Sequence, residues 1–397
     1  MGLGRGIIPH IEKYPGSIQY FNNISDVLGA TAATHVIMEF NVLAHMIPGY
    51  ITTGVQLFDW FMSIVNSYLE APSADIKVLV FVSDNYRTVP TEKNAVHLIR
   101  AAAAPSALAL EAQHSPGVTD AFCPASKLIN ISSRLIYSAI TYLIDRLAEV
   151  TLHEFERDVY VCLPSQKNDD GTNIVSVLGT NYPSGTNLKI SSSDGPLPPP
   201  TFPDGEGEIN GWRFIEFLRE HSPGCSILFC SIDTDNIGIG MLQHPSLRNN
   251  VFIQLKSAVH MDRPRQRRIV DCSVFSLVDP SELEKDLLLI LASGGSDYVY
   301  GVATTAPIPH VGIATIMKHA ARYYTRDPFT SRSVTGEISI LPAFYDFLRT
   351  FRTSKEVDEL APVLARIVWN MCYWSQIIHR SASAIPRILE HPGNMVL

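Results

Sequence analysis

Short apolar runs alternate with helical patterns along most of this chain, and few folds accept such an alternation. Each run is apolar enough to be buried on both faces of a sheet, and the runs span residues 35–39, 77–82, 158–163, 225–232, 251–255 and 269–272. Apolar residues with helical spacing lie near residues 55–69, 91–104, 126–149 and 209–220. Strands that alternate with helices are typical of a parallel sheet flanked by helices. We therefore predict an α/β fold with a mainly parallel sheet.

Shifts in composition indicate how the 397 residues are divided. Residues 164–204 are rich in Ser, Gly, Pro, Asn and Asp and show no periodicity, so we interpret them as a long surface loop or insertion within a domain. After Pro280 the pattern becomes mainly helical. We expect a core over residues 1–279 and a C-terminal part over residues 280–397 that forms a helical annex.

The charge and cysteine content exclude several classes of protein. The 31 basic and 39 acidic residues give a net charge of −8, which argues against a non-specific nucleic-acid coat but not against an enzyme whose acidic residues gather at metal ions. The six cysteines form no C-x-x-C pair, so we expect buried free thiols. No apolar stretch is long enough to cross a membrane, and residues 1–14 lack the apolar centre of a signal peptide. We expect an intracellular, cytoplasmic protein without a membrane partner.

Acidic residues stand where predicted strands end or helices begin. In chain order they are Glu39, Asp84, Glu206, Glu208, Asp233, Asp235 and Asp297. The carboxyl ends of parallel strands share one edge of a sheet, so these side chains would repel one another unless cations hold them together. Carboxylate oxygens suit Mg²⁺ or Mn²⁺, and two such ions about 4 Å apart can promote phosphodiester hydrolysis. Taken singly, each acid is also explained as a solvated turn or helix-cap residue.

Longer motifs around these acids resemble a known nuclease family. In chain order they read MGLGRGIIPHIEKYP, VIMEFNVLAH, PDGEGEINGWRFIEFLR, CSIDTDNIGIGML, ILASGGSDYVYGV and GEISILPAFYDFL. The series resembles the Xrn-type 5′→3′ exoribonucleases of the PIN-like nuclease superfamily, from Met1 to about Arg352. The resemblance implies a PIN-like core whose active site Asp297 of the C-terminal part completes. It also implies metal-dependent hydrolysis of RNA from a 5′-monophosphate end.

The resemblance assigns roles to individual residues. The acids named above would be catalytic and would ligate two Mg²⁺ or Mn²⁺ ions. His45 falls where the family stacks a histidine on the first nucleotide, although a lone histidine is equally well explained as a core residue. Lys93, His97 and Arg100 lie four and seven residues apart on one face of a predicted helix, where the family binds the 5′-phosphate. The alternative for these three is a partly solvated amphipathic helix.

Departures from the family pattern keep other functions open. Glu39 stands where the family has Asp, Asn210 and Gly211 replace a His–Lys pair, and AAAA follows Arg100 where the family has further basic residues. A catalytically silent relative with a binding or structural role is therefore one alternative. A DNA flap endonuclease is another, because VGIATIMKHAARY at 311–323 faintly resembles the helix-hairpin element of those enzymes. Since Glu is one methylene longer than Asp, we expect Glu39 to lower the rate, more with Mg²⁺ than with Mn²⁺.

Overall fold

The structure is a computed structural model, and its described residues form two compact units. The sheet unit comprises Tyr20–Ile232 and Gln254–Ile269, and the helical unit comprises Met1–Gln19, Asp233–Ile253 and Val270–Leu397. The described residues are 7–48, 51, 54–82, 143, 158–162, 166–167, 173–174, 177–179, 207–231, 233–258, 266–296, 328–334, 338–350 and 354–375.

The sheet has the strand order β1-β10-β9-β8-β2-β3-β4-β7. Its strands are β1 (Ile18–Phe21), β2 (His35–Glu39), β3 (Val78–Val82), β4 (Asp158–Cys162), β7 (Val177–Gly179), β8 (Ile227–Cys230), β9 (Val251–Ala258) and β10 (Gln266–Asp271). The division of the chain into units falls inside β1, β9 and β10. Among the described residues of the sheet unit, the helices are α2 (Ile24–Thr31), α3 (Phe40–Met46), α4 (Gly54–Leu69) and α9 (Gly207–His221). A separate antiparallel pair is formed by β5 (Gln166–Lys167) and β6 (Asn173–Ile174).

Strand β2 pairs in parallel on both of its sides. His35 lies opposite Val78 of β3 and opposite Ile227 of β8, and β3 in turn pairs in parallel with β4. At the edge, β4 pairs antiparallel with β7. Every residue of β2, β3 and β8 is buried, as expected for strands covered on both faces. The predicted α/β fold with a mainly parallel sheet is thereby confirmed, and each predicted apolar run overlaps a strand.

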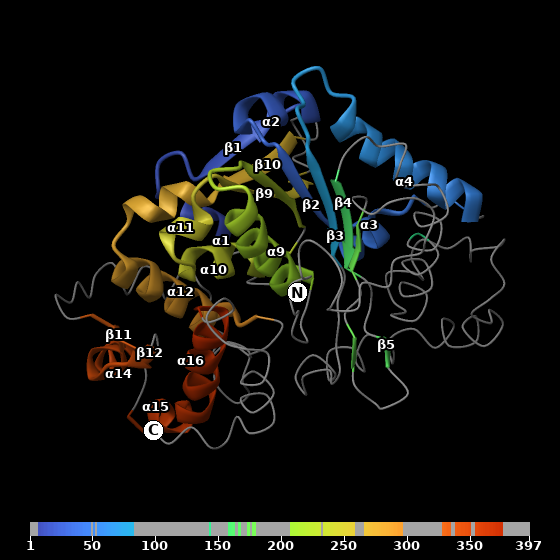
Figure 1. Cartoon of the computed structure of the whole chain (residues 1–397). Coiled ribbons are helices and arrows are strands. Elements are labelled where there is room, and N and C mark those ends of the chain that lie inside the picture. Colours follow the sequence, from blue (N-terminus) through green and yellow to red (C-terminus); the bar gives the residue numbers. More distant parts are fainter. Residues whose placement is uncertain are drawn as a thin grey trace. The chain divides into compact units, whose positions relative to one another are not determined.

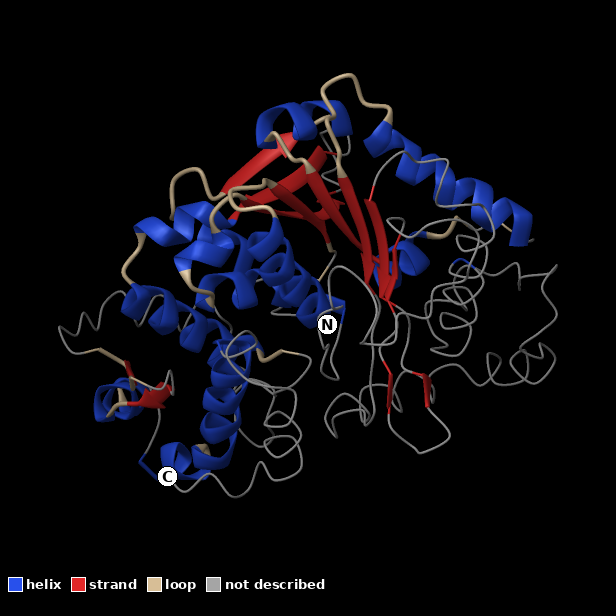
Figure 2. Cartoon of the chain, viewed as in Figure 1, coloured by secondary structure: helices blue, strands red, loops and turns tan. Residues whose placement is uncertain are grey.

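Helices α9 and α4 cover opposite faces of the sheet. Neighbouring residues of a strand point to opposite faces. Phe229 of β8 packs against Gly211 of α9, whereas Cys230, the next residue, donates a hydrogen bond to Tyr68 Oη of α4 at 3.4 Å. Figures 1 and 2 show helices on both sides of the strands of this unit.

An aromatic cluster fixes the end of β2. Phe40 directly follows this strand and is fully buried; its ring centroid lies 5.5 Å from that of Phe81 on β3 and 6.0 Å from that of Phe61 on α4. Stacked aromatic rings add about 0.5–1.5 kcal/mol per pair beyond their burial. The backbone of Glu39 is therefore held by a ring cluster at the residue that follows it.

The helical unit is built mainly from helices, with one small antiparallel sheet among its described residues. The helices are α1 (Ile7–Ile11), α10 (Asp235–Leu242), α11 (Pro245–Arg248), α12 (Pro280–Gly294), α14 (Pro342–Arg349), α15 (Ser354–Glu359) and α16 (Ala361–Ser375), with a 3₁₀ helix η3 (Cys272–Leu277). The small sheet pairs β11 (Thr330–Arg332) with β12 (Ile338–Ile340). Helices α10, α12 and α16 pack against one another. No helix among the described residues is long and apolar enough to cross a membrane.

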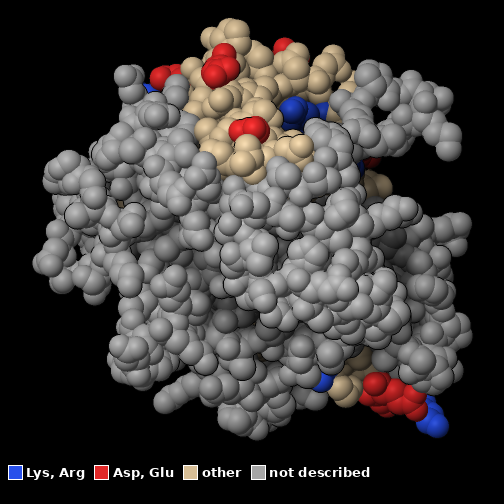
Figure 3. Space-filling view, turned by 90° about the vertical axis from the view of Figure 1, so that its right-hand side faces the viewer, with Lys and Arg blue, Asp and Glu red and all other residues tan. Residues whose placement is uncertain are grey.

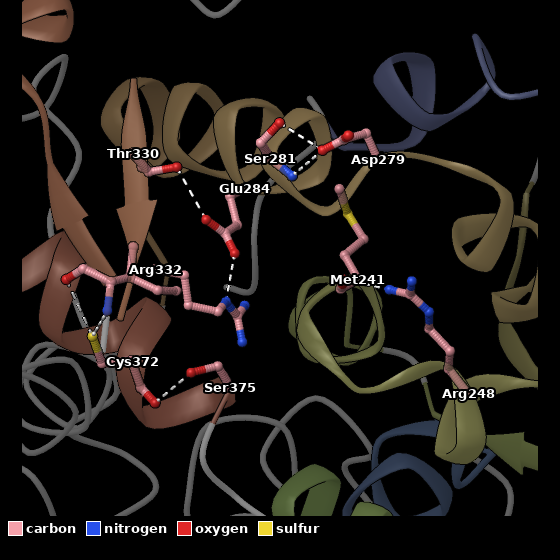
Figure 4. Close-up of polar contacts among 10 residues, drawn as sticks. Met241, Arg248, Asp279, Ser281, Glu284, Thr330, Arg332, Cys372 and Ser375 are labelled. Atoms are coloured by element: carbon pink, nitrogen blue, oxygen red, sulfur yellow. Dashed lines mark hydrogen bonds and ion pairs between the residues drawn. The ribbon is translucent and has the colours of Figure 1, made fainter. Parts of the chain in front are cut away.

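Buried charged side chains brace the helical unit (Figure 4). Glu284 of α12 accepts hydrogen bonds from Thr330 Oγ1 at 3.1 Å and from Arg332 Nε at 2.7 Å, which ties β11 to α12. Arg248 is buried and donates to the Met241 carbonyl of α10 at 2.7 Å and to a carbonyl of η3 at 2.8 Å. Carbonyls at helix ends lack intrahelical donors, and this guanidinium supplies a donor to each of the two; the η3 carbonyl, that of Phe275, also accepts the Val278 N–H at 3.3 Å.

A second network ties the start of the chain to α12. Asp286 of α12 is 1% exposed, and its Oδ2 accepts a hydrogen bond from Tyr14, forms an ion pair with Lys13 and lies 3.0 Å from His10 Nε2. Burial raises the pKa of this carboxyl, but the hydrogen bond and charge of His10 and the hydrogen bonds of Lys13 and Tyr14 lower it more. The pKa of Asp286 is therefore below its usual value. Asp286 is thus held as an anion by residues of the N-terminal segment.

Two features of the predicted domain organisation have structural counterparts. The predicted division between residues 279 and 280 falls at the start of α12, where Asp279 accepts a hydrogen bond from the Ser281 N–H at 2.8 Å and caps the helix. The predicted loop at 164–204 contains β5, β6 and β7, whose two or three residues are too few to leave a periodic pattern. The domain boundary itself stays a prediction.

We expect Asp286→Asn to lower the free energy of unfolding by about 3 kcal/mol, because removing one charge from a buried network leaves its partners uncompensated. Urea titration at neutral pH measures this change. The difference from wild type should persist above about pH 4, the ordinary range of an aspartate pKa, and shrink as pH falls through the lowered pKa of Asp286. The exposed Asp346, which pairs with Arg349 at 3.0 Å, is the control, and Asp346→Asn should cost less than about 1 kcal/mol. Equal effects of both variants would contradict the assignment.

Candidate active site at the end of strand β2

Glu39 is a buried carboxylate whose position follows from strand register. Met38 of β2 lies opposite Cys230 of β8 in the parallel pairing, so the next residues along each strand, Glu39 and Ser231, are neighbours. Ser231 Oγ donates a hydrogen bond to Glu39 Oε2 at 3.0 Å. Ser231 is 1% exposed and Glu39 is 4% exposed. A buried carboxylate needs donors or positive charge around it, and Ser231 supplies one of these donors.

The GEGE motif meets Glu39 through a glycine. An ideal Cβ built on Gly207 would lie 2.6 Å from Glu39 Cγ and 3.0 Å from Cδ, so a side chain there would overlap the stem of Glu39. Gly207 is the first residue of α9, and the N-terminus of a helix carries partial positive charge that favours a nearby carboxylate. Glu208 follows in the first turn of α9 and is 5% exposed. Two motifs far apart in the sequence therefore contact each other at this edge of the sheet.

The DTD motif lies in the helical unit. Asp233 Oδ1 accepts a hydrogen bond from the Asp235 backbone N–H at 3.1 Å, and Asp235 is the first residue of α10. The Asp235 side chain is 2% exposed. The motif thus starts a helix with one carboxylate bound to its backbone and the other buried, which is compatible with a cap role and with a ligand role.

The remaining predicted site residues are not tested by the structure. Those that lie outside the described residues are Asp84, Lys93, His97, Arg100, Glu206 and Asp297. His45 lies on α3, but its side chain is outside the described part. Among the described residues no three His, Cys, Asp or Glu side chains form a group that could hold a metal ion, and several predicted ligands are outside that set. The complete ligand set therefore stays a prediction.

Other titratable groups near this sheet remain neutral at neutral pH. Burial raises the pKa of the Cys230 thiol to about 11 and raises the pKa of Tyr68 well above its usual value. At the other end of β2, burial, together with the charges of Arg219 and Lys77, lowers the pKa of His35 to about 4. These groups are thus poor nucleophiles or general bases. The expectation of buried free thiols is confirmed for Cys230 and Cys272, whereas the free thiols of Cys225 and Cys372 are only partly buried. Figure 3 shows that both acidic and basic side chains are exposed among the described residues on the face drawn there.

Packing explains one departure from the family pattern. An ideal Cβ on Gly211 would lie 2.0 Å from Phe229 Cζ, and Phe229 is fully buried in β8. The neighbouring Asn210 is also buried. A lysine at position 211 would have to displace the Phe229 ring, so the glycine is required by the close approach of α9 to the sheet.

Two features of this site were not predicted from the sequence: the participation of Ser231 and the need for a glycine at position 207. Ser231 is the polar residue that ends the apolar run ILFC, on the same face of β8 as Phe229. The sequence could have indicated only the face of Ser231, because a residue two positions after Phe229 points to the same side of the sheet. Its contact with Glu39 depends on the parallel register of two distant strands.

Comparison of the chain with models of known protein families and with curated proteins gave no match.

We expect Gly207→Ala to lower the free energy of unfolding by about 1–3 kcal/mol, because the added methyl overlaps the stem of Glu39. Chemical denaturation measures this change. In a Glu39→Ala background the overlap is gone, so the same substitution should cost much less. Gly29→Ala in α2 is the control: its Cβ meets Ser73 at an ordinary 3.6 Å, and alanine should stabilise that helix by up to about 1 kcal/mol. A cost that is unchanged in the Glu39→Ala background would show that Gly207 is needed for another reason.

Proposed function

We propose that this chain is a metal-dependent nuclease with a PIN-like core, which hydrolyses RNA from a 5′-monophosphate end in the manner of the Xrn-type exoribonucleases. One observation carries the proposal. The Glu39 carboxylate at the end of β2 lies against Gly207, so that the VIMEF and GEGE segments, which resemble separate acidic motifs of that family, share one edge of the sheet. Ligand sites of parallel α/β sheets lie at the carboxyl ends of their strands.

The donor set at this edge fits a hard divalent cation. Glu39 and Glu208 are both buried, and carboxylate oxygens are the ligands that Mg²⁺ and Mn²⁺ prefer. We propose that two such ions are held by the acids of the motif series, Glu39, Asp84, Glu206, Glu208, Asp233, Asp235 and Asp297. When bound, a pair of divalent ions supplies the Lewis acidity that phosphodiester hydrolysis requires.

The chain's own residues then have distinct tasks. Ser231 and Gly207 fix the orientation of Glu39. We propose that Lys93, His97 and Arg100 bind the 5′-phosphate by charge-assisted hydrogen bonds and that His45 stacks on the first nucleotide. A phosphate pocket of this kind would admit a terminal monophosphate and so give the enzyme its polarity.

A catalytically silent relative is the second candidate, and a specific contact favours it. Asp233 Oδ1 accepts a hydrogen bond from the first backbone N–H of α10. Glu39 lies at the positive end of α9. Both carboxylates therefore stabilise helix starts, a task that needs no metal and no substrate.

Asp233→Asn separates these two candidates. The substitution keeps Oδ1, the acceptor for the Asp235 N–H, and removes the negative charge. We expect normal folding and a loss of roughly 100-fold or more in the rate of RNA hydrolysis, as for other disturbances of a preorganised site. The assay follows end-labelled 5′-monophosphate RNA and the matching DNA with Mg²⁺, with Mn²⁺ and with EDTA. Wild-type activity in the variant would place Asp233 outside the site. Absence of hydrolysis by the wild-type chain under every condition favours the silent relative, and cleavage of the DNA alone favours a DNA nuclease such as a flap endonuclease.

We also expect 5′-monophosphate RNA to be degraded faster than the same RNA with a 5′-hydroxyl end. The proposed reason is the cationic face formed by Lys93, His97 and Arg100. Parallel time courses on the two substrates measure the preference, and Arg100→Ala should reduce it by slowing only the phosphorylated substrate. If both ends are degraded equally fast by the wild-type chain, the phosphate pocket is wrong.

A further inference from the structure

We infer that Ser231 is a positioning residue for Glu39, and that this site is built for a glutamate rather than an aspartate at position 39. The inference rests on the proposed metal site. It reverses the expectation from the sequence that the longer side chain of Glu39 lowers the rate.

The hydrogen-bond donor is rigid. Ser231 has a single side-chain torsion before its hydroxyl, and its backbone N–H donates to the Gln254 carbonyl of β9 at 3.1 Å. Its neighbour Cys230 is paired opposite Met38 in the parallel register. The position of Ser231 Oγ relative to β2 is thus set by the sheet itself, and the 3.0 Å hydrogen bond to Oε2 fixes one oxygen of the carboxylate. Such a neutral donor stabilises the charged form of Glu39 without competing for its charge.

The space for the longer side chain comes from Gly207. Glu39 Cδ and Oε1 lie 3.0 and 3.2 Å from the position that a Gly207 Cβ would occupy, so any other residue there would crowd the end of a glutamate side chain, whereas an aspartate has neither atom. An aspartate ends one carbon earlier, which withdraws its carboxylate from Ser231 by about 1 Å or more, and misplacement of that size in a preorganised site is costly. Ser231 and Gly207 therefore accommodate Glu39 together: one binds the end of its side chain and the other makes room for its middle.

Neighbouring groups that orient a metal ligand typically contribute 10–100-fold to metal affinity. We expect Ser231→Ala to weaken Mn²⁺ binding to the full chain by roughly 10–100-fold, and Glu39→Asp to weaken rather than strengthen it. Because an aspartate no longer reaches Ser231, adding Ser231→Ala to Glu39→Asp should cause little further loss. Titration calorimetry with Mn²⁺ alone measures these affinities without any substrate.

Control variants separate positioning from damage to the fold. Ser226→Ala removes a hydroxyl just before β8, where Ser226 Oγ donates to the Thr31 carbonyl at 2.7 Å, and it should leave Mn²⁺ affinity unchanged. Ser231→Thr keeps the hydroxyl and should restore most of the affinity. Urea unfolding of every variant shows which are folded. If Ser231→Ala does not fold, the Mn²⁺ affinities of the Glu39→Asp and Ser231→Thr proteins test the inference instead.

The outcomes separate this inference from the proposed function. If the wild-type chain binds no Mn²⁺, both are overturned. If the wild-type chain binds Mn²⁺, three results overturn only the inference: folded Ser231→Ala binds as tightly as wild type, Glu39→Asp binds as tightly or more tightly, or the losses of the two single variants multiply in the double variant. Weaker binding by each single variant, with no further loss in the double variant, supports it.

Discussion

The parallel pairing of β2 with both β3 and β8 is the constraint on which the rest of the sheet unit depends. It joins segments from three distant parts of the chain and buries all of their residues. It also fixes which residues meet where the strands end. Because Met38 lies opposite Cys230, Glu39 and Ser231 come together one step later, and a register shifted by one residue would turn Ser231 to the other face. The site is thus a direct consequence of strand register.

The second requirement is the close approach of α9 to this edge. Gly207 meets the stem of Glu39 and Gly211 meets the ring of Phe229, so both contacts depend on the absence of a Cβ. A glycine in a helix costs up to about 1 kcal/mol in helix propensity compared with alanine. Gly211 lies inside α9 and carries this cost, which the close packing of helix against strand offsets, whereas Gly207 is the first residue of α9 and carries little of it. Stability of the fold and orientation of Glu39 therefore depend on the same helix face.

The sequence predicted the strands well because strands buried on both faces appear as continuous apolar runs. It also singled out Glu39, since an acid directly after such a run needs a particular reason. It could not predict the contacts of Ser231 or Gly211, because a serine after a strand or a glycine in a helix is common and acquires meaning only through register and packing. The Asp286 network escaped notice for the same reason: Tyr14 and Asp286 are 272 residues apart in the sequence, and the members of the network come together only in the fold.

The two proposed roles of Glu39 place different demands on its charge. As an acceptor for Ser231 Oγ and a partner for the start of α9, a glutamine of the same shape would serve almost as well, because its amide oxygen also accepts hydrogen bonds. A buried carboxylate costs far more desolvation than a buried amide. The stability of the fold therefore depends on the shape of this side chain rather than on its charge. A bound cation would stabilise both the shape and the charge, so the proposed nuclease, unlike the silent relative, requires a carboxylate at position 39.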